Sequence, residues 1–186
     1  MSEVKQRLLE TTYAILEAEG PAALTTRRVC EQAGVTLPTL YHHFGNRDGL
    51  LAAVHAFALE RFIAYKRGLR ETADPVADLR TGGERIVEFA AAHRNVAIAV
   101  MSRAIEEPSL LDVGRALLRR RVERVEQAER LAVSVDEAVD AIWAVIQGLA
   151  LLTLVPESQA RDHRRVQAIV LDTLFARLCR AKPERS

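Results

Sequence analysis

Apolar residues recur at helical spacing along almost the whole chain, and no stretch alternates apolar and polar residues at a period of two. This spacing is typical of amphipathic α-helices and not of half-buried strands. Val4, Leu8 and Ile15 lie on one face of a first helix, which Gly20-Pro21 ends. The pattern therefore predicts an all-α protein of about nine helices.

Capping and breaking residues set the predicted bounds of the other helices. Capping candidates stand before four helical patterns, where their side chains can accept hydrogen bonds from the first N–H groups: Thr25 or Thr26, Thr36, Asn46 and Asp74. Arg94-Asn95 is expected to break the pattern. After the first helix, the predicted helices cover about residues 25–32, 36–44, 46–70, 74–92, 96–105, 110–131, 134–156 and 162–180.

The segment from Thr25 to Leu50 reads as a helix, a tight turn around Gly34 and a second helix. A short helix with an exposed polar face fits the major groove of DNA, and hydroxyl groups suit phosphate oxygens. The side chains expected to face solvent on this second helix are those of Thr36, Leu37, Thr39, Tyr41 and His42. Three cations flank it, namely Arg27, Arg28 and Arg47.

The residues of this segment resemble the TetR family of bacterial transcriptional repressors. The resemblance lies in Ala33-Gly34-Val35-Thr36, in Thr39-Leu40-Tyr41-His42-His43-Phe44, and in Arg47-Asp48 before Leu50. It implies that Thr26, Arg27 and Arg47 contact the phosphate backbone, that Thr36 caps the recognition helix, and that Thr39, Tyr41 and His42 face DNA. Leu37 offers no hydrogen bond and can read only an apolar surface such as a thymine methyl group.

The resemblance also implies that the chain has two domains with different functions. Residues 1–60 would form the helix-turn-helix DNA-binding domain, and residues 61–186 a larger helical domain for effector binding and dimerisation. The implied function is a transcriptional repressor that binds a palindromic operator in double-stranded DNA as a homodimer and is released by a small molecule. A DNA-binding regulator or scaffold without an effector is the alternative.

Charge changes this picture in one respect. The whole chain has a net charge of +1, and residues 1–50 carry five cationic and six anionic side chains, a net charge of −1. Bulk charge therefore cannot hold DNA, and binding must depend on where the cations lie. We expect a shallow salt dependence, because few phosphates would be contacted.

Residues 141–156 form an uncharged run of 16 residues that is apolar nearly all round. A helix of this kind must bury both faces, so one face is expected to meet a partner subunit. With one side of the last helix it would form a four-helix interface between two chains. The predicted interface residues are Ala141, Ala144, Val145, Gly148, Leu152, Val166, Val170, Thr173 and Leu174.

Effector contacts are harder to read from the sequence, since an apolar stripe is usually core. The candidates are Phe62, Phe89, Met101, Trp143 and Gln147. Gln147 stands out because an amide inside an uncharged run needs a hydrogen-bond partner. The few polar candidates favour an apolar or aromatic effector.

Other classes find little support. The sequence holds no P-loop, GxSxG or HExxH motif and no convincing pair of carboxylates, so no enzyme activity, cofactor or metal is predicted. His42 and His43 point about 100° apart on a helix and cannot readily share an ion. The cations around Arg119 are expected to form an exposed, salt-bridged helix face. Two isolated cysteines and the absence of a signal or membrane segment predict a cytoplasmic protein.

Overall fold

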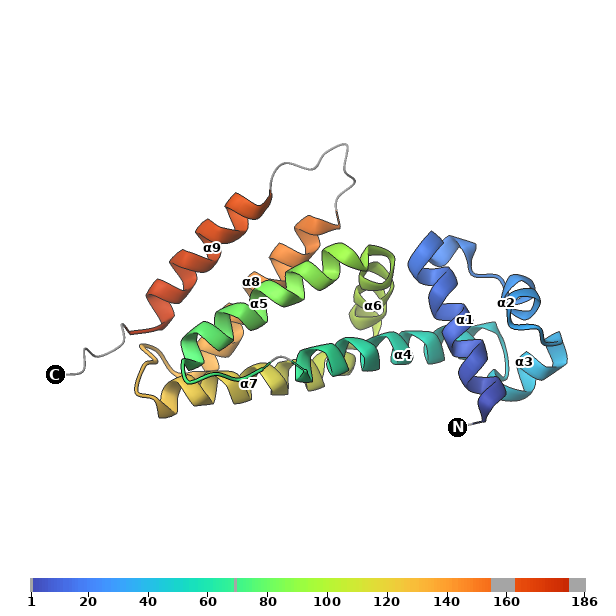
Figure 1. Cartoon of the computed structure of the whole chain (residues 1–186), viewed down its shortest axis with the longest axis horizontal. Coiled ribbons are helices and arrows are strands. Elements are labelled where there is room, and N and C mark those ends of the chain that lie inside the picture. The colour runs from blue at the N-terminus through green and yellow to red at the C-terminus, as the bar shows by residue number, and fades with distance from the viewer. Residues whose placement is uncertain (1, 69, 155–162, 181–186) are drawn as a thin grey trace. The chain divides into compact units, whose positions relative to one another are not determined.

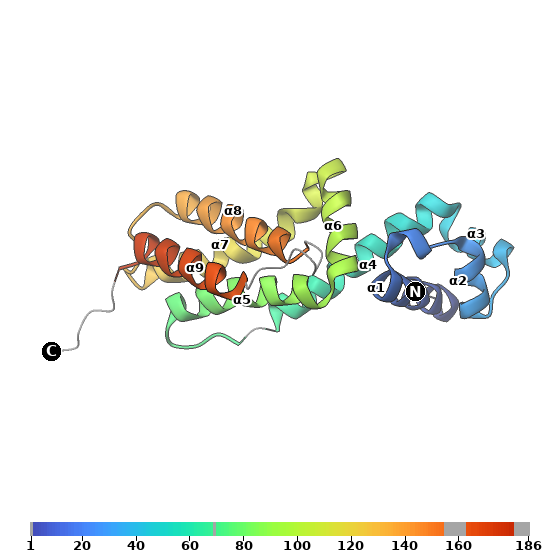
Figure 2. The same ribbon diagram turned by 90° about the horizontal axis from the view of Figure 1, so that it is seen from above.

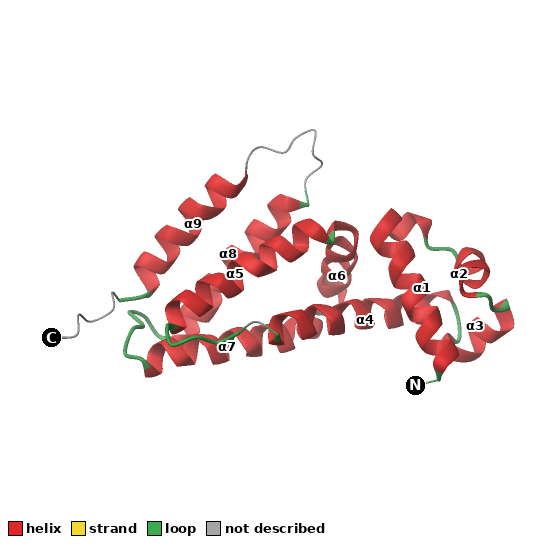
Figure 3. Cartoon of the chain, in the orientation of Figure 1, coloured by secondary structure: helices red, strands yellow, loops and turns green. Residues whose placement is uncertain are grey.

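The computed structural model describes residues 2–68, 70–154 and 163–180, and within these ranges the chain is built from helices. Figure 3 shows helices joined by loops, and no strand is present in the described residues. The α-helices are α1 (Glu3–Glu19), α2 (Thr26–Ala33), α3 (Leu37–Phe44), α4 (Arg47–Arg67), α5 (Pro75–Ala92), α6 (Arg94–Glu106), α7 (Asp112–Gln127), α8 (Val135–Thr153) and α9 (His163–Leu178). Two short 3₁₀ helices cover Pro21–Ala23 and Pro108–Leu111. The predicted all-α fold is therefore confirmed.

The predicted helix starts agree with the caps in the structure. The Thr25 hydroxyl accepts a hydrogen bond from the Arg28 N–H, and Asn46 Oδ1 accepts one from the Gly49 N–H at 2.8 Å. Asp74 Oδ1 accepts from the N–H groups of the second and third residues of α5. Polar side chains thus satisfy N–H groups that have no partner inside each helix.

Several predicted bounds differ from the structure, among them the end of the helix expected over residues 46–70, since α4 ends at Arg67. The break predicted at Arg94-Asn95 lies at His93 instead (φ −117°, ψ 48°), so α5 ends at Ala92 as predicted and α6 begins at Arg94. The helix expected over residues 110–131 is shorter, since α7 begins at Asp112 and ends at Gln127. A left-handed residue, Glu129 with φ 58°, follows it and turns the chain. The helix expected to reach Pro156 ends at Thr153, and the ends expected at Pro156 and Asp162 lie outside the described residues.

The chain divides into two compact units. The first comprises residues 1–65 and 93–110, and the second comprises residues 66–92 and 111–186. Helix α6 therefore belongs with the N-terminal helices although it follows α5 in the sequence (Figure 1). The boundary predicted at residue 60 falls inside the continuous helix α4.

In the first unit, α1 packs against α2, α3 and α6. Its core is a cluster of apolar side chains that includes the fully buried Leu8, Leu16, Val29, Leu40 and Val54. Burying such side chains is the main stabilising contribution to a domain of this size, at about 1.5–3 kcal/mol for each one. Because α3 contributes Leu40 to this core, one face of α3 is fixed inward and the other is directed outward.

Polar contacts fasten α6 to the end of α1 within the first unit. The Asn95 side-chain amide donates to the Glu17 carbonyl at 2.9 Å, and His93 Nδ1 pairs with the Glu17 carboxylate. Val96 and Ala99 of α6 are buried in the shared core. The first unit is therefore assembled from two separate segments of sequence.

In the second unit, α8 packs against α5, α7 and α9, and both views show these four helices as a bundle (Figure 2). The core side chains include Leu79, Val122, Val139, Ile142 and Leu171. A capping box begins α8, in which Ser134 and Glu137 each bond the other's backbone N–H. No helix in the described part of the chain combines the length and apolar character needed to cross a bilayer.

Candidate nucleic-acid interface

The turn between α2 and α3 depends on Gly34. It adopts the left-handed conformation, with φ 64° and ψ 40°, and its N–H donates to the Cys30 carbonyl. The Val35 N–H donates to the same carbonyl at 3.1 Å, so both groups close the end of α2. An L side chain at Gly34 would be strained, because the left-handed region costs about 1–2 kcal/mol for ordinary residues. The turn fixes how α3 leaves α2.

Helix α3 begins at a threonine pair. Thr36 Oγ1 accepts a hydrogen bond from the Thr39 N–H at 3.4 Å, and the two hydroxyl oxygens are 2.9 Å apart. Thr36 is the N-cap residue in extended conformation, and Pro38 stands in the first turn, where a missing N–H costs little. The first turn of α3 therefore presents hydroxyl groups, which are suited to an oxyanion such as phosphate.

The outward face of α3 carries large side chains. Leu37 is 41% exposed and Tyr41 is 39% exposed, whereas Leu40 between them is fully buried. His42 is exposed, and its ring meets the half-buried His43 ring edge-to-face with 5.2 Å between centroids. Thr39 is half-buried. Leu37 and Tyr41, four positions apart, thus share one exposed face of this helix, whereas Thr39 points to another side.

The junction from α3 to α4 places Arg47 at the start of α4. Gly49 makes this junction possible, since a Cβ atom at that position would collide with the Phe44 carbonyl oxygen. Arg47 is exposed and follows the Asn46 cap directly. A cation at the end of α3 and hydroxyl groups at its beginning frame the exposed face.

The two cations of α2 lie beside carboxylates. Arg27 Nε donates to Glu31 Oε1 at 2.8 Å, on the exposed surface of α2. Arg28 forms a two-bond pair with Glu19 at the end of α1. The hydrogen bond from Glu31 and then its charge raise the pKa of Arg27 above its usual value. Thr26, the other predicted residue of α2, is half-buried at the first position of the helix.

The predicted subunit interface falls on α8 and α9 of the second unit. Ala144, Gly148, Leu152, Val166 and Thr173 are exposed, while Ala141, Val145, Val170 and Leu174 are half-buried. Two further apolar residues are exposed here, Leu151 at 61% and Ile169 at 56%. The sequence analysis did not select these two, although their apolar character was a usable signal.

The five predicted effector residues are all half-buried, and they do not gather in one unit. Phe62 and Met101 belong to the first unit, and Phe89, Trp143 and Gln147 to the second. The Trp143 ring lies against Gly114, where a Cβ atom would be 3.4 Å from the ring. Beside it, the buried Lys66 ammonium donates to the Gly114 carbonyl at 3.3 Å.

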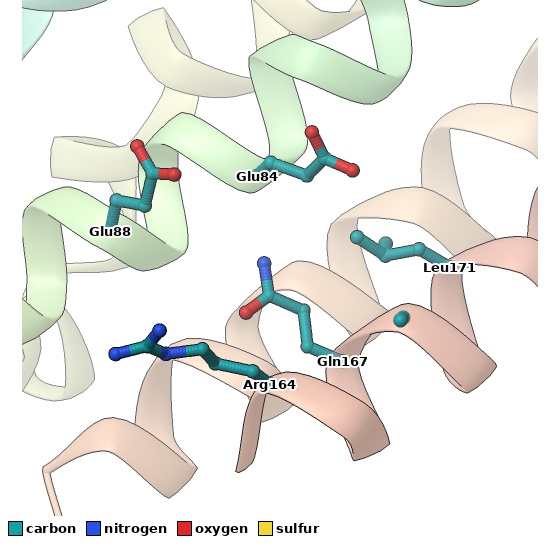
Figure 4. A pocket seen from close by; sticks show the side chains of 6 residues that line it. Glu84, Glu88, Arg164, Gln167 and Leu171 are labelled. Carbon is teal, nitrogen blue, oxygen red and sulfur yellow. The ribbon is translucent and has the colours of Figure 1, made fainter. Parts of the chain in front are cut away.

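A shallow pocket of about 190 Å³ lies between α5 and α9 and includes none of the predicted effector residues. Glu84 and Glu88 line it from α5, and Arg164 and Gln167 from α9, as Figure 4 shows. Arg80 pairs with Glu84 at 3.0 Å, and Arg85 with Glu88 at 3.0 Å. Among the described residues, no group of three or more His, Cys, Asp or Glu side chains is placed to hold a metal ion.

The geometry of α2, the Gly34 turn and α3 defines a helix-turn-helix protein. Comparison with known sequences gives a family match: residues 8–54 match the model described as "Bacterial regulatory proteins, tetR family". Over these residues the chain is similar to the DNA-binding segment of TetR-family transcriptional regulators.

One curated relative is HTH-type transcriptional regulator BetI 2 of Chromohalobacter salexigens, 39% identical over 49 residues. The match covers 26% of this chain and only about a quarter (24%) of that relative, so the chain is similar in sequence to a small part of that protein. The larger part of the chain has to be compared through its fold.

Solved structures show the same fold over nearly the whole chain. A TetR transcription regulator from Haloarcula marismortui has a TM-score of 0.77 and 18% identity, over 97% of this chain and 100% of that chain. FadR from Bacillus subtilis, in complex with stearoyl-CoA, has a TM-score of 0.70 and 17% identity, over 93% of this chain and 98% of that chain. These likenesses show a common fold beyond the segment matched in sequence.

Proposed function

We propose that this protein is a transcriptional repressor that binds a palindromic operator as a homodimer and is released by a small-molecule effector. The exposed face of α3 carries the proposal: Leu40 fixes the helix in the core while Leu37 and Tyr41 remain exposed on its other side. Such a helix enters the major groove, where Tyr41 and the Thr36 and Thr39 hydroxyl groups meet phosphates or base edges. The proposed function involves binding and no catalytic step.

Unbiased selection of DNA from a random pool tests the DNA-binding step. We expect two symmetric half-sites whose centres lie about 34–36 Å apart, one turn of DNA. Tyr41→Ala should lower affinity by about tenfold to a hundredfold, since one DNA contact is worth about 1–3 kcal/mol. The matched control is Ile105→Ala, which truncates an 82% exposed apolar side chain of the same unit outside the motif. No enriched DNA, or equal affinities for wild type and Tyr41→Ala, would contradict the proposal.

The proposed dimer rests on the apolar surface of α8 and α9. A Cβ atom at Gly148 would meet nothing within 4 Å, so a long side chain there leaves the fold of one subunit intact. Gly148→Arg should give monomers in sedimentation experiments at micromolar concentration and should weaken operator binding. Thr81→Arg, on the exposed side of α5, is the control and should remain dimeric. A wild-type monomer bound to a full operator would refute this part.

The proposed effector site lies near Phe89, Trp143 and Gln147 in the second unit. The FadR structure holds stearoyl-CoA, which supports small-molecule binding by a fold of this kind. Trp143 is the only tryptophan of the chain, so its fluorescence reports directly on this region. An effector should change Trp143 fluorescence and weaken operator binding, and DNA should lower effector affinity by the same factor.

A regulator without an effector is the second candidate, and close packing in the second unit favours it. A Cβ atom at Gly83 of α5 would lie only 2.6 Å from Ile146 Cδ1 of α8. If no apolar or aromatic compound in a broad panel changes both Trp143 fluorescence and operator affinity, this second candidate replaces the first.

A further inference from the structure

The first unit needs positive charge at specific places, because residues 1–50 carry more carboxylates than cations. Two of its cations, Arg27 and Arg28, are paired with Glu31 and Glu19. The two opposite charges of each ion pair nearly cancel, so neither pair attracts a phosphate that lies farther away than a hydrogen bond. If a phosphate replaces Glu31 as the partner of Arg27, the unpaired Glu31 carboxylate stays close to DNA and repels it. The attraction to DNA must therefore come largely from cations outside these two pairs.

Within residues 1–50, the other cations are Lys5, Arg7 and Arg47, and none of these three forms an ion pair with a carboxylate in the described part of the chain. Arg47 already belongs to the predicted interface. Lys5 and Arg7 both lie on α1, but two helical positions separate them, so their side chains point to nearly opposite sides, about 160° apart. Position on the helix therefore distinguishes these two cations, although both carry the same charge.

The Lys5 side chain is directed to the end of α3. Its Nζ atom lies over the Phe44 ring, 5.6 Å from the ring centroid, and Phe44 is the last residue of α3. Figure 1 shows the N-terminal end of α1 beside α3. A cation over an aromatic face is held in place without losing its charge. Lys5 and Arg47 thus supply two positive charges near the same end of the exposed helix.

We propose that Lys5 binds a DNA phosphate beside the end of α3 and so acts as a further binding residue of the operator complex. The inference rests on the proposed DNA-binding function. The ligand is a backbone phosphodiester, which a lysine ammonium can bind through charge and hydrogen bonds without reading the base sequence. Phe44 positions the ammonium, and the two subunits of a dimer would place one such contact at each half-site.

The test measures operator affinity at several salt concentrations for Lys5→Gln, Lys5→Arg and Arg7→Gln. Lys5→Gln should lower affinity several-fold and reduce the slope of log K against log salt by about one per subunit. The loss should be equal for operator and random DNA, since a phosphate contact carries no sequence information. Lys5→Arg keeps the charge and should retain the wild-type slope. Arg7→Gln removes the same charge from the other side of α1 and should change the slope little.

The outcomes separate this inference from the proposed function. A wild-type protein that binds no DNA refutes the proposed function itself. A wild-type protein that binds its operator while Lys5→Gln keeps the wild-type slope refutes the role of Lys5. Equal losses for Lys5→Gln and Arg7→Gln would also refute it, because net charge alone would then explain the effect. Equal melting temperatures of the variants show that a loss of affinity comes from the interface and not from unfolding.

Discussion

Replacing Lys66 by methionine should stabilise the protein at neutral pH. Lys66 is only 9% exposed, and burial, followed by the charge of nearby Arg121, lowers its pKa from 10.5 to about 8. The folded protein therefore releases the Lys66 proton more readily than the unfolded chain, which keeps the ordinary pKa. A lowering of this size corresponds to about 3 kcal/mol of unfavourable free energy when the amine is charged. Methionine has a similar length and carries no charge to bury.

The pH dependence gives the sharper measurement. Below about pH 8 the ammonium is charged in both states, and the full penalty destabilises the fold. Between about pH 8 and pH 10.5 the unfolded chain binds more protons than the folded chain, so wild-type stability rises with pH. Lys66→Met lacks this contribution. Its advantage should be largest at pH 7, up to about 3 kcal/mol, and should shrink toward zero near pH 10.5.

Urea unfolding followed by circular dichroism at pH 7, 8.5 and 10 measures this difference. The control is Arg67→Met, which removes a charge from the next, exposed position of α4. This control should alter stability by at most about 0.5 kcal/mol, as is usual for surface positions, with no trend from pH 7 to 10. If Lys66→Met is less stable than wild type at pH 7, or if its difference from wild type stays constant with pH, the burial argument is wrong.

Three further predictions concern single contacts. Gly34→Ala should destabilise the first unit by about 1 kcal/mol, because nothing crowds that position and only the positive φ is unfavourable; a neutral result in urea unfolding would show that the turn relaxes. Burial opposes ionisation of Asp78, but hydrogen bonds from Thr72 and the Arg124 guanidinium lower its pKa overall. Its stabilising effect is therefore present above the unfolded pKa near 4 and is lost as pH falls. Asp78→Asn should be less stable than wild type at pH 7 and should lose less stability on acidification, so parallel acid-unfolding curves would contradict this. Glu31→Gln should strengthen DNA binding several-fold at low salt, because it frees Arg27 from its ion pair. If fluorescence anisotropy shows no gain in affinity, the ion pair with Glu31 does not weaken DNA binding by Arg27.

The sequence predicted the fold well wherever a local signal was strong. Thr25, Thr36, Asn46 and Asp74 were expected to cap helices, and all four accept hydrogen bonds from the first turns of α2, α3, α4 and α5. These contacts join residues two or three positions apart, so they can be read from the sequence. The exposed side of α3 was also predictable, because the turn and the apolar positions around it fix the helix orientation.

Contacts between distant segments were not predictable. The break expected at Arg94-Asn95 lies at His93 instead. Asn95 belongs to α6, where its side-chain amide donates a hydrogen bond to the Glu17 carbonyl, far away in the sequence. The cations of α7 were expected to form an exposed salt-bridged face. Arg119 does pair with Asp136 on the surface, but Arg124 turns inward to the buried Asp78. Nothing in the local pattern distinguishes these two arginines, since their partners lie on other elements.

The same limit applies to the candidate site. The DNA-facing side chains proposed on α3 follow from a single helix and its turn, so the sequence alone suggests them, and they stay a prediction. The sequence does not suggest Lys5, because its contact with Phe44 joins α1 to α3 across the fold. The pairing of Arg28 with Glu19 likewise joins α2 to the end of α1. These two contacts decide which cations stay available, and only the folded unit reveals them.

The tie between Glu17 and the start of α6 has a practical consequence for protein engineering. An N-terminal fragment cut at residue 60 would lack Val96 and Ala99, and would uncover the apolar side chains that they cover in the intact unit. A chimera that transplants the first unit onto another helical domain therefore needs three junctions, near residues 65, 93 and 110. Grafts with a single junction should give aggregating or protease-sensitive products, whereas grafts that carry α6 along should fold.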